Sequence, residues 1–535
     1  MDRRGLSVGF IAVVITLILG LGVALAASPK RGGTLRVAYG NKVSHLDFHT
    51  APGYEMMWVA MNIGCGLVNI TPDGQFVGDA ATSWEVSPDG KTYTFKLSDN
   101  VYFHDGTKVD AAAVKYSIDR LMDPATKSGM RRFYEPVAFV EVTDPQTVTV
   151  QMKRPYAFFL HMIAGYRTGL VIYSPTATEK YGLDDRKKGT PRAVVGCGPF
   201  KLAEWVPNDH LVMDRWEKYH KEGQPYVDRV IVRVIKDPVT QMAAFKTGEI
   251  DFIASFSPEH VNTLKAQNPD AQIFTGPETT PMVAIMKVTN PAPGEKKLSD
   301  KRVPHPVFGD IRVRKAVACY GMDRDEIVQI AFKGGATPWL GMIPPGTLDT
   351  VNVNSMCPYD QEKAKALLKE AGYGPDKPLK FEIQTDTEKS VFNVIATVIK
   401  EQMARIGAEA TIRLVDKVTW STTVIRDGEW DMSVEDLAAL LTLDGNAYLS
   451  AVGASWNISR HTDMQVNELY KQYASEMDSV KRAAIAKEMA EHVADNLWWN
   501  TVSGSPFYQV AQPSIKGYTF NKEFEVHYET VWLDK

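Results

Sequence analysis

Few residues of this 535-residue chain have the types and spacing that catalysis or metal binding requires. His45 and His49 are four residues apart, the spacing at which two imidazoles share one helix face, but the residues between them do not favour a helix. Glu435 and Asp436 could form an acid/base dyad only in a loop, because adjacent side chains on a strand point to opposite faces. Beyond the first 27 residues the patterns H-E-x-x-H, G-x-S-x-G and G-x-x-x-x-G-K-[ST] do not occur. We therefore predict no catalytic residue, no metal site and no cofactor.

Strand and helix patterns alternate along the chain, which is typical of α/β lobes with partly parallel sheets. Strands are predicted over 35–39, 91–97, 147–152, 227–235, 379–384 and 410–415. Helices are predicted over 111–121, 238–247, 311–320, 323–332, 360–371, 390–406, 463–477 and 480–496. The Pro/Gly-rich stretch 290–309 is expected to be a long surface excursion just after a crossing between lobes.

The first 26 residues have the pattern of a cleavable export signal. Arg3 and Arg4 precede an apolar run over 6–25, and Ala24-Leu25-Ala26 supplies the small residues that a signal peptidase recognises. An uncleaved anchor is the alternative, since about 20 apolar residues can span a bilayer. The first cysteine is Cys65, so no lipid-acceptor cysteine follows the apolar run. We expect a periplasmic protein that is not a lipoprotein.

Composition and cysteine spacing exclude several classes of protein. The formal net charge is −4 and no basic tract of five or more residues occurs, which argues against nucleic acid and anionic membranes as partners. The four cysteines form no C-x-x-C pair, so neither a zinc ribbon nor a redox dithiol is indicated. Cys319 with Cys357 is the first disulfide to test, but buried thiols are equally compatible with the sequence.

An ordered set of short motifs runs through the mature chain. The set comprises 81–95 (ATSWEVSPDGKTYTF), 103–107 (FHDGT), 195–202 (VGCGPFKL), 311–317 (IRVRKAV), 322–328 (MDRDEIV), 344–346 (PPG) and 359–368 (YDQEKAKALL). In this order it resembles the family 5 solute-binding proteins of ABC importers, the peptide- and nickel-type cluster C group. Cys197 replaces the threonine of that family's G-T-G-P turn.

The resemblance implies an α/β fold of the two-lobed periplasmic binding protein type II (Venus flytrap), with an extra subdomain in the first lobe. The expected divisions are a signal peptide over 1–26, a lobe I core from 27–60, 190–280 and 505–535, an extra subdomain over 61–189, and lobe II over 281–504. Such a protein is a monomeric binding subunit rather than an enzyme. It would capture a small polar solute between its lobes and deliver it to the permease subunits in the membrane.

Position in the family pattern also implies which residues contact the solute. From lobe I these are Tyr39, Asn41, Thr50 and Tyr54, and from lobe II they are Glu435, Asp436, Tyr448 and Trp456. Aromatic rings suit this role because flat amphipathic surfaces bind varied ligands at low entropic cost.

One departure from the family pattern bears on the solute. Peptide-binding relatives carry an aspartate that anchors the peptide's α-amino group, and Leu440 occupies that position here. An ordinary oligopeptide is therefore less favoured, and a sugar or an opine gains weight. The alternatives are a metal-chelate or haem binder on the same scaffold, an exported α/β hydrolase, and a chaperone-like binder with an exposed apolar surface.

Overall fold

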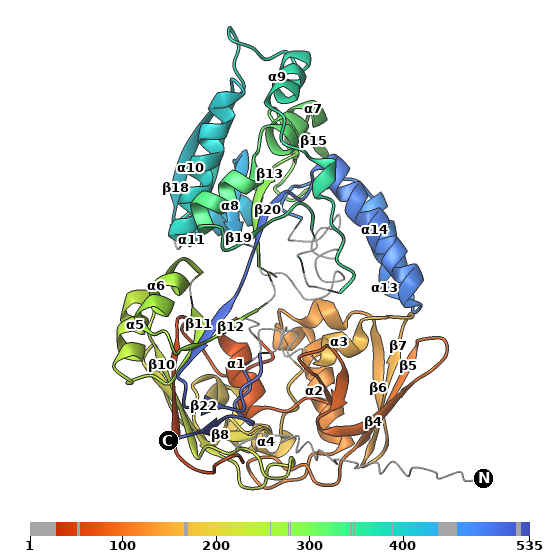
Figure 1. Cartoon of the computed structure of the whole chain (residues 1–535). Helices are drawn as coiled ribbons and strands as arrows, with labels where there is room; N and C mark the ends of the chain where they lie inside the picture. Colours follow the sequence, from red (N-terminus) through yellow and green to blue (C-terminus); the bar gives the residue numbers. More distant parts are fainter. Residues whose placement is uncertain are drawn as a thin grey trace, which may run out of the picture.

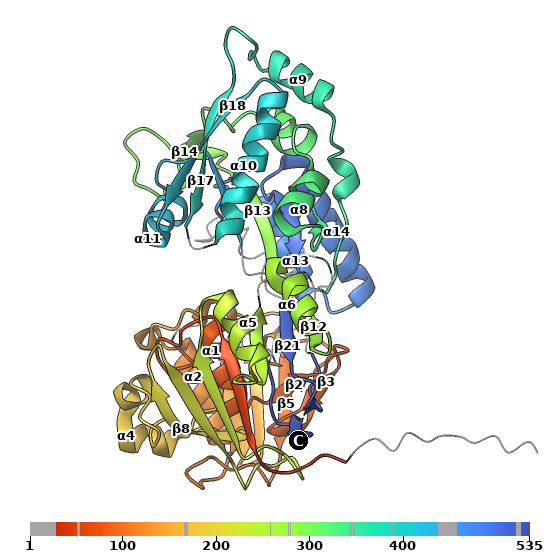
Figure 2. The same cartoon turned by 60° about the vertical axis from the view of Figure 1, so that its left-hand side comes forward.

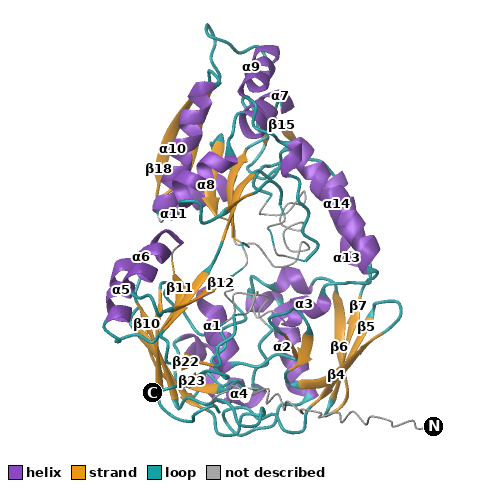
Figure 3. Ribbon diagram, in the orientation of Figure 1, coloured by secondary structure: helices purple, strands orange, loops and turns teal. Residues whose placement is uncertain are grey.

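The structure is a computed structural model that describes residues 28–50, 54–164, 170–256, 258–276, 278, 280–342, 345, 348–387, 389–436, 457–520 and 526–535. The export signal over 1–26, Leu440, Tyr448 and Trp456 lie outside these residues. Helices and strands alternate in both halves of the molecule (Figure 3), so the expected α/β class is confirmed.

The first lobe is built on a seven-stranded mixed sheet whose strands come from distant parts of the chain. Its order is β12-β21-β11-β1-β10-β9-β8. The strands are β1 (Thr34–Tyr39), β8 (Phe200–Val206), β9 (His210–Arg215), β10 (Arg229–Val234), β11 (Phe252–Phe256), β12 (Gln272–Thr275) and β21 (Tyr508–Ala511). Central β1 runs parallel to both β10 and β11, and Leu35 and Val37 are fully buried in the core. Helices α1 (Tyr54–Ile63), α4 (Pro175–Lys187), α5 (Pro238–Lys246) and α6 (Val261–Gln267) belong to the same lobe.

A separate four-stranded antiparallel sheet, β4-β5-β7-β6, lies beside this lobe. Its strands are β4 (Ala81–Val86), β5 (Thr92–Leu97), β6 (Val137–Asp144) and β7 (Thr147–Met152), and the nearby helices are α2 (Ala111–Met122) and α3 (Phe159–Ala164). The side chain of Asp110 caps α2 by accepting from the backbone N–H of Ala113. Gly196 and Gly198 lie against α1, where an added Cβ would fall 2.0 Å from Ile63 O and 2.4 Å from Gly64 O respectively. Glycine at these two positions therefore allows the backbones to approach closely at this turn.

The second lobe is built on a six-stranded sheet of order β16-β20-β13-β19-β17-β18. The strands are β13 (Thr280–Met286), β16 (Thr337–Pro338), β17 (Lys380–Asp386), β18 (Glu409–Val415), β19 (Met432–Asp436) and β20 (Thr501–Ser505). The helices are α7 (Ile311–Arg314), α8 (Arg324–Phe332), α9 (Gln361–Glu370), α10 (Ser390–Arg405), α11 (Lys417–Trp420), α13 (Gln465–Ser475) and α14 (Ser479–Asn496). Gly372 and Gly407 follow α9 and α10 with φ of 87° and 81°, as expected of glycines that end helices.

Two expectations about lobe II need correction. The helix expected over 311–320 is α-helical only as far as Arg314 and continues as a π-helix over Lys315–Tyr320. The stretch 290–309 is not purely a surface excursion, because it contains most of the hairpin of β14 (Thr289–Pro291) and β15 (Arg302–Pro304). Phe308 is fully buried. The stretch therefore carries the Arg302 side chain and the Phe308 ring into the interior, which its Pro/Gly-rich composition does not reveal.

Both pairs of cysteines form disulfides. Cys319 bonds to Cys357, the pair that the sequence suggested first, and Cys65 bonds to Cys197 across 132 residues of chain. The second bridge fastens the start of the four-stranded-sheet region to the chain that returns into β8.

The two lobes are joined by two chain crossings (Figures 1 and 2). One leads from β12 to β13 over residues 276–279, and the other leads from β20 to β21 over 506–507. A third contact lies away from the crossings, where the Phe158 ring stacks on Tyr473 of α13 with centroids 4.9 Å apart. The Ala157 N–H donates to Ala474 O beside it at 2.9 Å. The lobes are therefore linked covalently on one side and by packing on another.

Candidate functional site

The carboxyl ends of the parallel strands in both sheets point toward the other lobe. In lobe I, β1, β10 and β11 are parallel, and Thr275 at the end of β12 pairs with Tyr508 at the crossing. In lobe II, β17, β18 and β19 are parallel, and Asp436 at the end of β19 pairs with Met282 near the start of β13. In open α/β sheets, ligands bind outside the carboxyl ends of strands. The geometry therefore places one candidate site between the two lobes.

The lobe I residues proposed from the sequence lie at the end of β1 and in the segment that follows. Tyr39 is the last residue of β1, and its ring packs against Trp58 with centroids 5.0 Å apart. Asn41, two residues further, is exposed. Thr50 is half-buried and its hydroxyl donates to Asp47 O at 3.2 Å. Tyr54 begins α1, and its side chain lies outside the described residues.

Asp47 fixes the segment between Asn41 and Thr50. Its carboxylate accepts two hydrogen bonds from Arg120, at 3.0 and 2.7 Å, and one from the Tyr173 hydroxyl at 3.0 Å. Burial would raise the pKa of Asp47, but the Arg120 guanidinium outweighs it and holds the pKa below its usual range. His49 stacks on Tyr173 with centroids 4.0 Å apart, and burial lowers its pKa to about 3. Residues 45–49 form a turn and bend, which agrees with the rejection of a helical His45–His49 pair.

Charged side chains gather at the lobe II edge of the site. Asp386 ends β17, Lys417 begins α11 directly after β18, and Glu435 and Asp436 end β19. Lys417 Nζ lies 2.7 Å from Asp386 Oδ2, and Lys389 forms an ion pair with Asp436. The sequence reasoning missed Asp386 and Lys417, although their positions at the carboxyl ends of predicted strands were the signal that could have identified them.

Glu435 differs from its charged neighbours. Only 1% of its surface is exposed, and among the residues that the structure describes neither of its carboxylate oxygens has a hydrogen-bond partner. Burial raises the pKa of Glu435 well above its usual value; Lys417 opposes this rise, and Asp436 and Asp386 add to it. Glu435 is therefore a carboxyl group that the described part of the chain does not pair.

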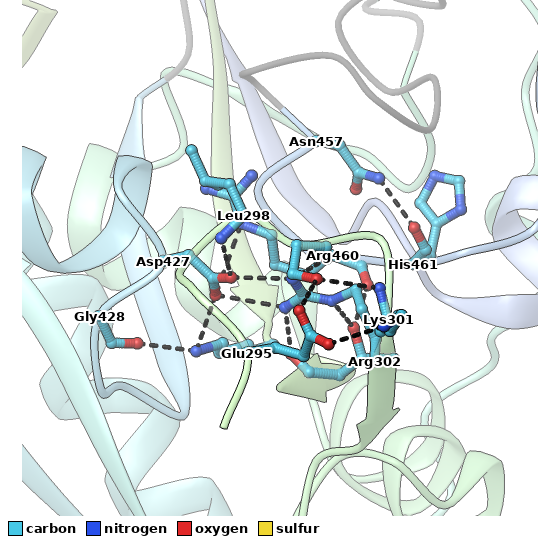
Figure 4. A network of polar contacts seen from close by, with 12 residues as sticks. Glu295, Leu298, Lys301, Arg302, Asp427, Gly428, Asn457, Arg460 and His461 are labelled. Atoms are coloured by element: carbon cyan, nitrogen blue, oxygen red, sulfur yellow. Dashed lines mark hydrogen bonds and ion pairs between the residues drawn. The ribbon is translucent and has the colours of Figure 1, made fainter. Parts of the chain in front are cut away.

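A buried charged cluster fixes the chain that follows residues 437–456 (Figure 4). Asp427 lies 3.0 Å from Lys287 Nζ, 2.9 Å from Arg302 and 3.8 Å from Arg460. Arg460 also donates to Val424 O and Ile425 O, at the end of a π-helix. This cluster lies beyond the amino end of β19, so it supports the site without being part of it.

Two further observations concern metals and membranes. Over the described ranges, no group of three or more His, Cys, Asp or Glu side chains is arranged to hold a metal ion. Within those same ranges, no helix combines the length and the apolar composition needed to cross a bilayer. The Nε2 atom of His104 lies 3.0 Å from Gly198 O, and burial lowers the pKa of His104 to about 4, so this imidazole has a structural role at the turn.

Comparison with known proteins agrees with this architecture. The family model "Bacterial extracellular solute-binding proteins, family 5 Middle" matches residues 75–460. The glutathione-binding protein GsiB of Escherichia coli K12 is 31% identical over 399 residues, which cover 74% of this chain and 73% of GsiB. The structure of AgaA from A. tumefaciens R10, in complex with agropinic acid, aligns with a TM-score of 0.77 and 26% identity over 94% of this chain and 99% of AgaA.

A more distant structure has the same fold. The ABC transporter substrate-binding protein CtaP of Listeria monocytogenes aligns with a TM-score of 0.82 at 21% identity, over 95% of this chain and 100% of CtaP. The match of the family model over most of the chain, together with the two-lobed architecture, shows that this protein belongs to the family 5 bacterial extracellular solute-binding proteins.

Proposed function

We propose that this protein captures a small polar solute between the carboxyl ends of its two sheets. The protein is a substrate-binding subunit of an ABC importer, so the bound solute is passed to a membrane permease. The observation that supports this site is that both sheets present their strand ends to each other across two crossings. Crossings of this kind act as a hinge, and a solute that contacts both lobes stabilises the closed form.

The proposed solute is peptide-like, or sugar- or opine-like. GsiB is named for glutathione, AgaA was solved with agropinic acid, and DppA of Helicobacter pylori was solved with the peptide STSA. These solutes share several polar groups on a small frame. The contacts proposed on this chain are Asn41 and Thr50 from lobe I and Glu435 and Asp436 from lobe II, with Tyr39, Tyr54, Tyr448 and Trp456 as the aromatic candidates.

We also propose that the chain is exported to the periplasm after cleavage of residues 1–26, acts as a monomer, and releases its solute unaltered. Burial of most of a solute in such a site gives micromolar affinity, about −8 kcal/mol.

A thermal-shift panel tests the proposal. The purified mature chain is mixed with glutathione, di- and oligopeptides, agropinic acid, oligosaccharides and nickel–histidine. A solute at about 100 times its Kd stabilises the native state by about 2.7 kcal/mol, which raises the unfolding midpoint. The rise in the unfolding midpoint should disappear in Trp456→Ala if that residue contributes to the site. Catalytic turnover of a bound solute, or a panel without any shift, would contradict the proposal.

A further inference from the structure

Glu435 is the one group at the proposed site whose charge the described part of the chain leaves uncompensated. The residue lies one position from the end of β19, opposite Val283 on β13. Its carboxylate is buried and, within the described ranges, has no hydrogen-bond partner. A buried ionised carboxylate without a partner is strongly destabilising, so such a group either stays protonated or acquires a cation.

The nearby lysines already have other partners. Lys417 Nζ lies 2.7 Å from Asp386 Oδ2 and 4.2 Å from the centroid of the Trp420 ring, so its ammonium group is held on the Asp386 side. Lys389 is paired with Asp436. Three carboxyl groups, Asp386, Glu435 and Asp436, therefore face two ammonium groups. Counted over these five described groups alone, the edge has one positive charge fewer than negative charges when all of them are ionised.

We infer that Glu435 binds a cationic group of the solute, a protonated amine or a guanidinium. This inference rests on the proposed capture of a solute at the carboxyl ends of the sheets. The incoming cation supplies the charge that the edge lacks and donates hydrogen bonds to the two unpartnered carboxylate oxygens. Charge-assisted hydrogen bonds of this kind are the strong ones in proteins. Sugars without a cationic group would gain nothing from this contact.

The protonation of Glu435 provides an independent sign of the same event. Burial raises the pKa of Glu435 above its usual value, opposed by Lys417 of α11 and reinforced by Asp436 of β19 and Asp386 of β17. A cation placed against the carboxylate favours its ionised form and lowers that pKa again. Binding at a pH below the raised pKa therefore releases a proton to the buffer.

The test compares probes that differ only in the cationic group. Titration calorimetry measures the affinities of glutathione and trialanine, whose amino groups are protonated, against N-acetylglutathione and N-acetyltrialanine. Agropinic acid and cellobiose complete the set. The proteins are the full mature chain, its Glu435→Gln variant and the control variant Glu409→Gln. Glu409 begins β18 and so lies at the amino ends of the parallel strands, whereas Glu435 lies near their carboxyl ends. Wild-type titrations in phosphate and in Tris at one pH report the proton release.

The expected result is that a free-amine probe binds the wild type about 10- to 100-fold more tightly than its acetylated form. Glu435→Gln should remove this preference and should unfold at the same midpoint as the wild type or a higher one. Its affinity for the acetylated probe should stay within about threefold of the wild-type value. Glu409→Gln should behave as the wild type. Heats that differ between the two buffers in the sense of proton release support the same contact.

Three results would overturn the inference and leave the proposed function standing. They are equal affinity for amine and acetylated probes, an amine preference that survives in Glu435→Gln, and binding only of probes without a cation. Failure of every solute, here and in the thermal-shift panel, would instead remove the proposed function and the inference with it.

Discussion

Replacement of Asp427 by asparagine should destabilise lobe II severely. Asp427 is only 3% exposed and is surrounded by Lys287, Arg302 and Arg460, whose side chains are 2%, 7% and 4% exposed. The substitution preserves the shape of the side chain and removes the single negative charge from this cluster. The three buried cations would then repel one another, and the acceptors that the described residues leave to them, backbone carbonyls and the Thr289 hydroxyl, carry no charge.

The magnitude follows from burial. Removal of one partner from a buried ion pair costs about 3–5 kcal/mol, because the remaining charge stays desolvated. Burial would raise the pKa of Asp427, but Arg302 and Lys287 outweigh it and lower the pKa from 3.8 to about 2. A carboxyl group with a lowered pKa stabilises the fold above its unfolded pKa and loses that contribution as the pH falls through about 2. The destabilisation by Asp427→Asn should therefore be constant between about pH 5 and 8.

Urea denaturation monitored by tryptophan fluorescence at pH 5, 6.5 and 8 measures this effect. The matched control is Glu409→Gln, which removes the carboxylate of an ion pair with Lys380 whose side chains are 68% and 57% exposed. An exposed pair contributes at most about 1 kcal/mol. If Asp427→Asn cost no more than the control, or if its cost changed steeply between pH 5 and 8, the view of Asp427 as an ionised, buried counter-charge would be wrong.

The remaining predictions concern other contacts of the fold. Gly196→Ala should lower the free energy of unfolding by more than about 2 kcal/mol in the same urea assay, because the new Cβ would fall 2.0 Å from Ile63 O, whereas Gly374→Ala, with nothing within 4 Å, should change it by less than about 0.5 kcal/mol. Conversion of Cys65 and Cys197 to serine should lower the free energy of unfolding by about 5 kcal/mol through loop entropy. Loss of the Cys319–Cys357 bridge, which closes a loop of 38 residues, should lower it by about 1 kcal/mol less. Calorimetric melting of the two double variants shows whether the first is the less stable. Tyr473→Ala should increase the radius of gyration of the solute-free protein in X-ray scattering, since it removes the ring that stacks on Phe158 across the lobes, and an unchanged scattering profile would show that this contact does not hold the lobes together.

Local sequence patterns were sufficient to predict most helices and strands of this protein. The period-two segment 147–152 coincides with β7, and the helix predicted over 390–406 differs from α10 by one residue. These predictions succeed because side-chain periodicity and capping act between residues close in the chain. The ordered motifs likewise indicated the family, since each one is a short run of neighbouring residues that can be recognised without the tertiary structure. The π-helix over 315–320 was not predicted, because its side chains have the same amphipathic pattern as an α-helix.

The character of the candidate site was decided by the tertiary structure. The sequence marks Glu435 and Asp436 as neighbours of the same charge, yet the fold pairs Asp436 with Lys389 and buries Glu435 without a described partner. The cluster around Asp427 joins positions 287, 302, 427 and 460, which no local pattern connects. The ionisation and pairing of these side chains depend on their burial and on charged groups within a few ångströms. Those charged groups are brought close by the strand order of the sheet, in which neighbouring strands are remote in sequence.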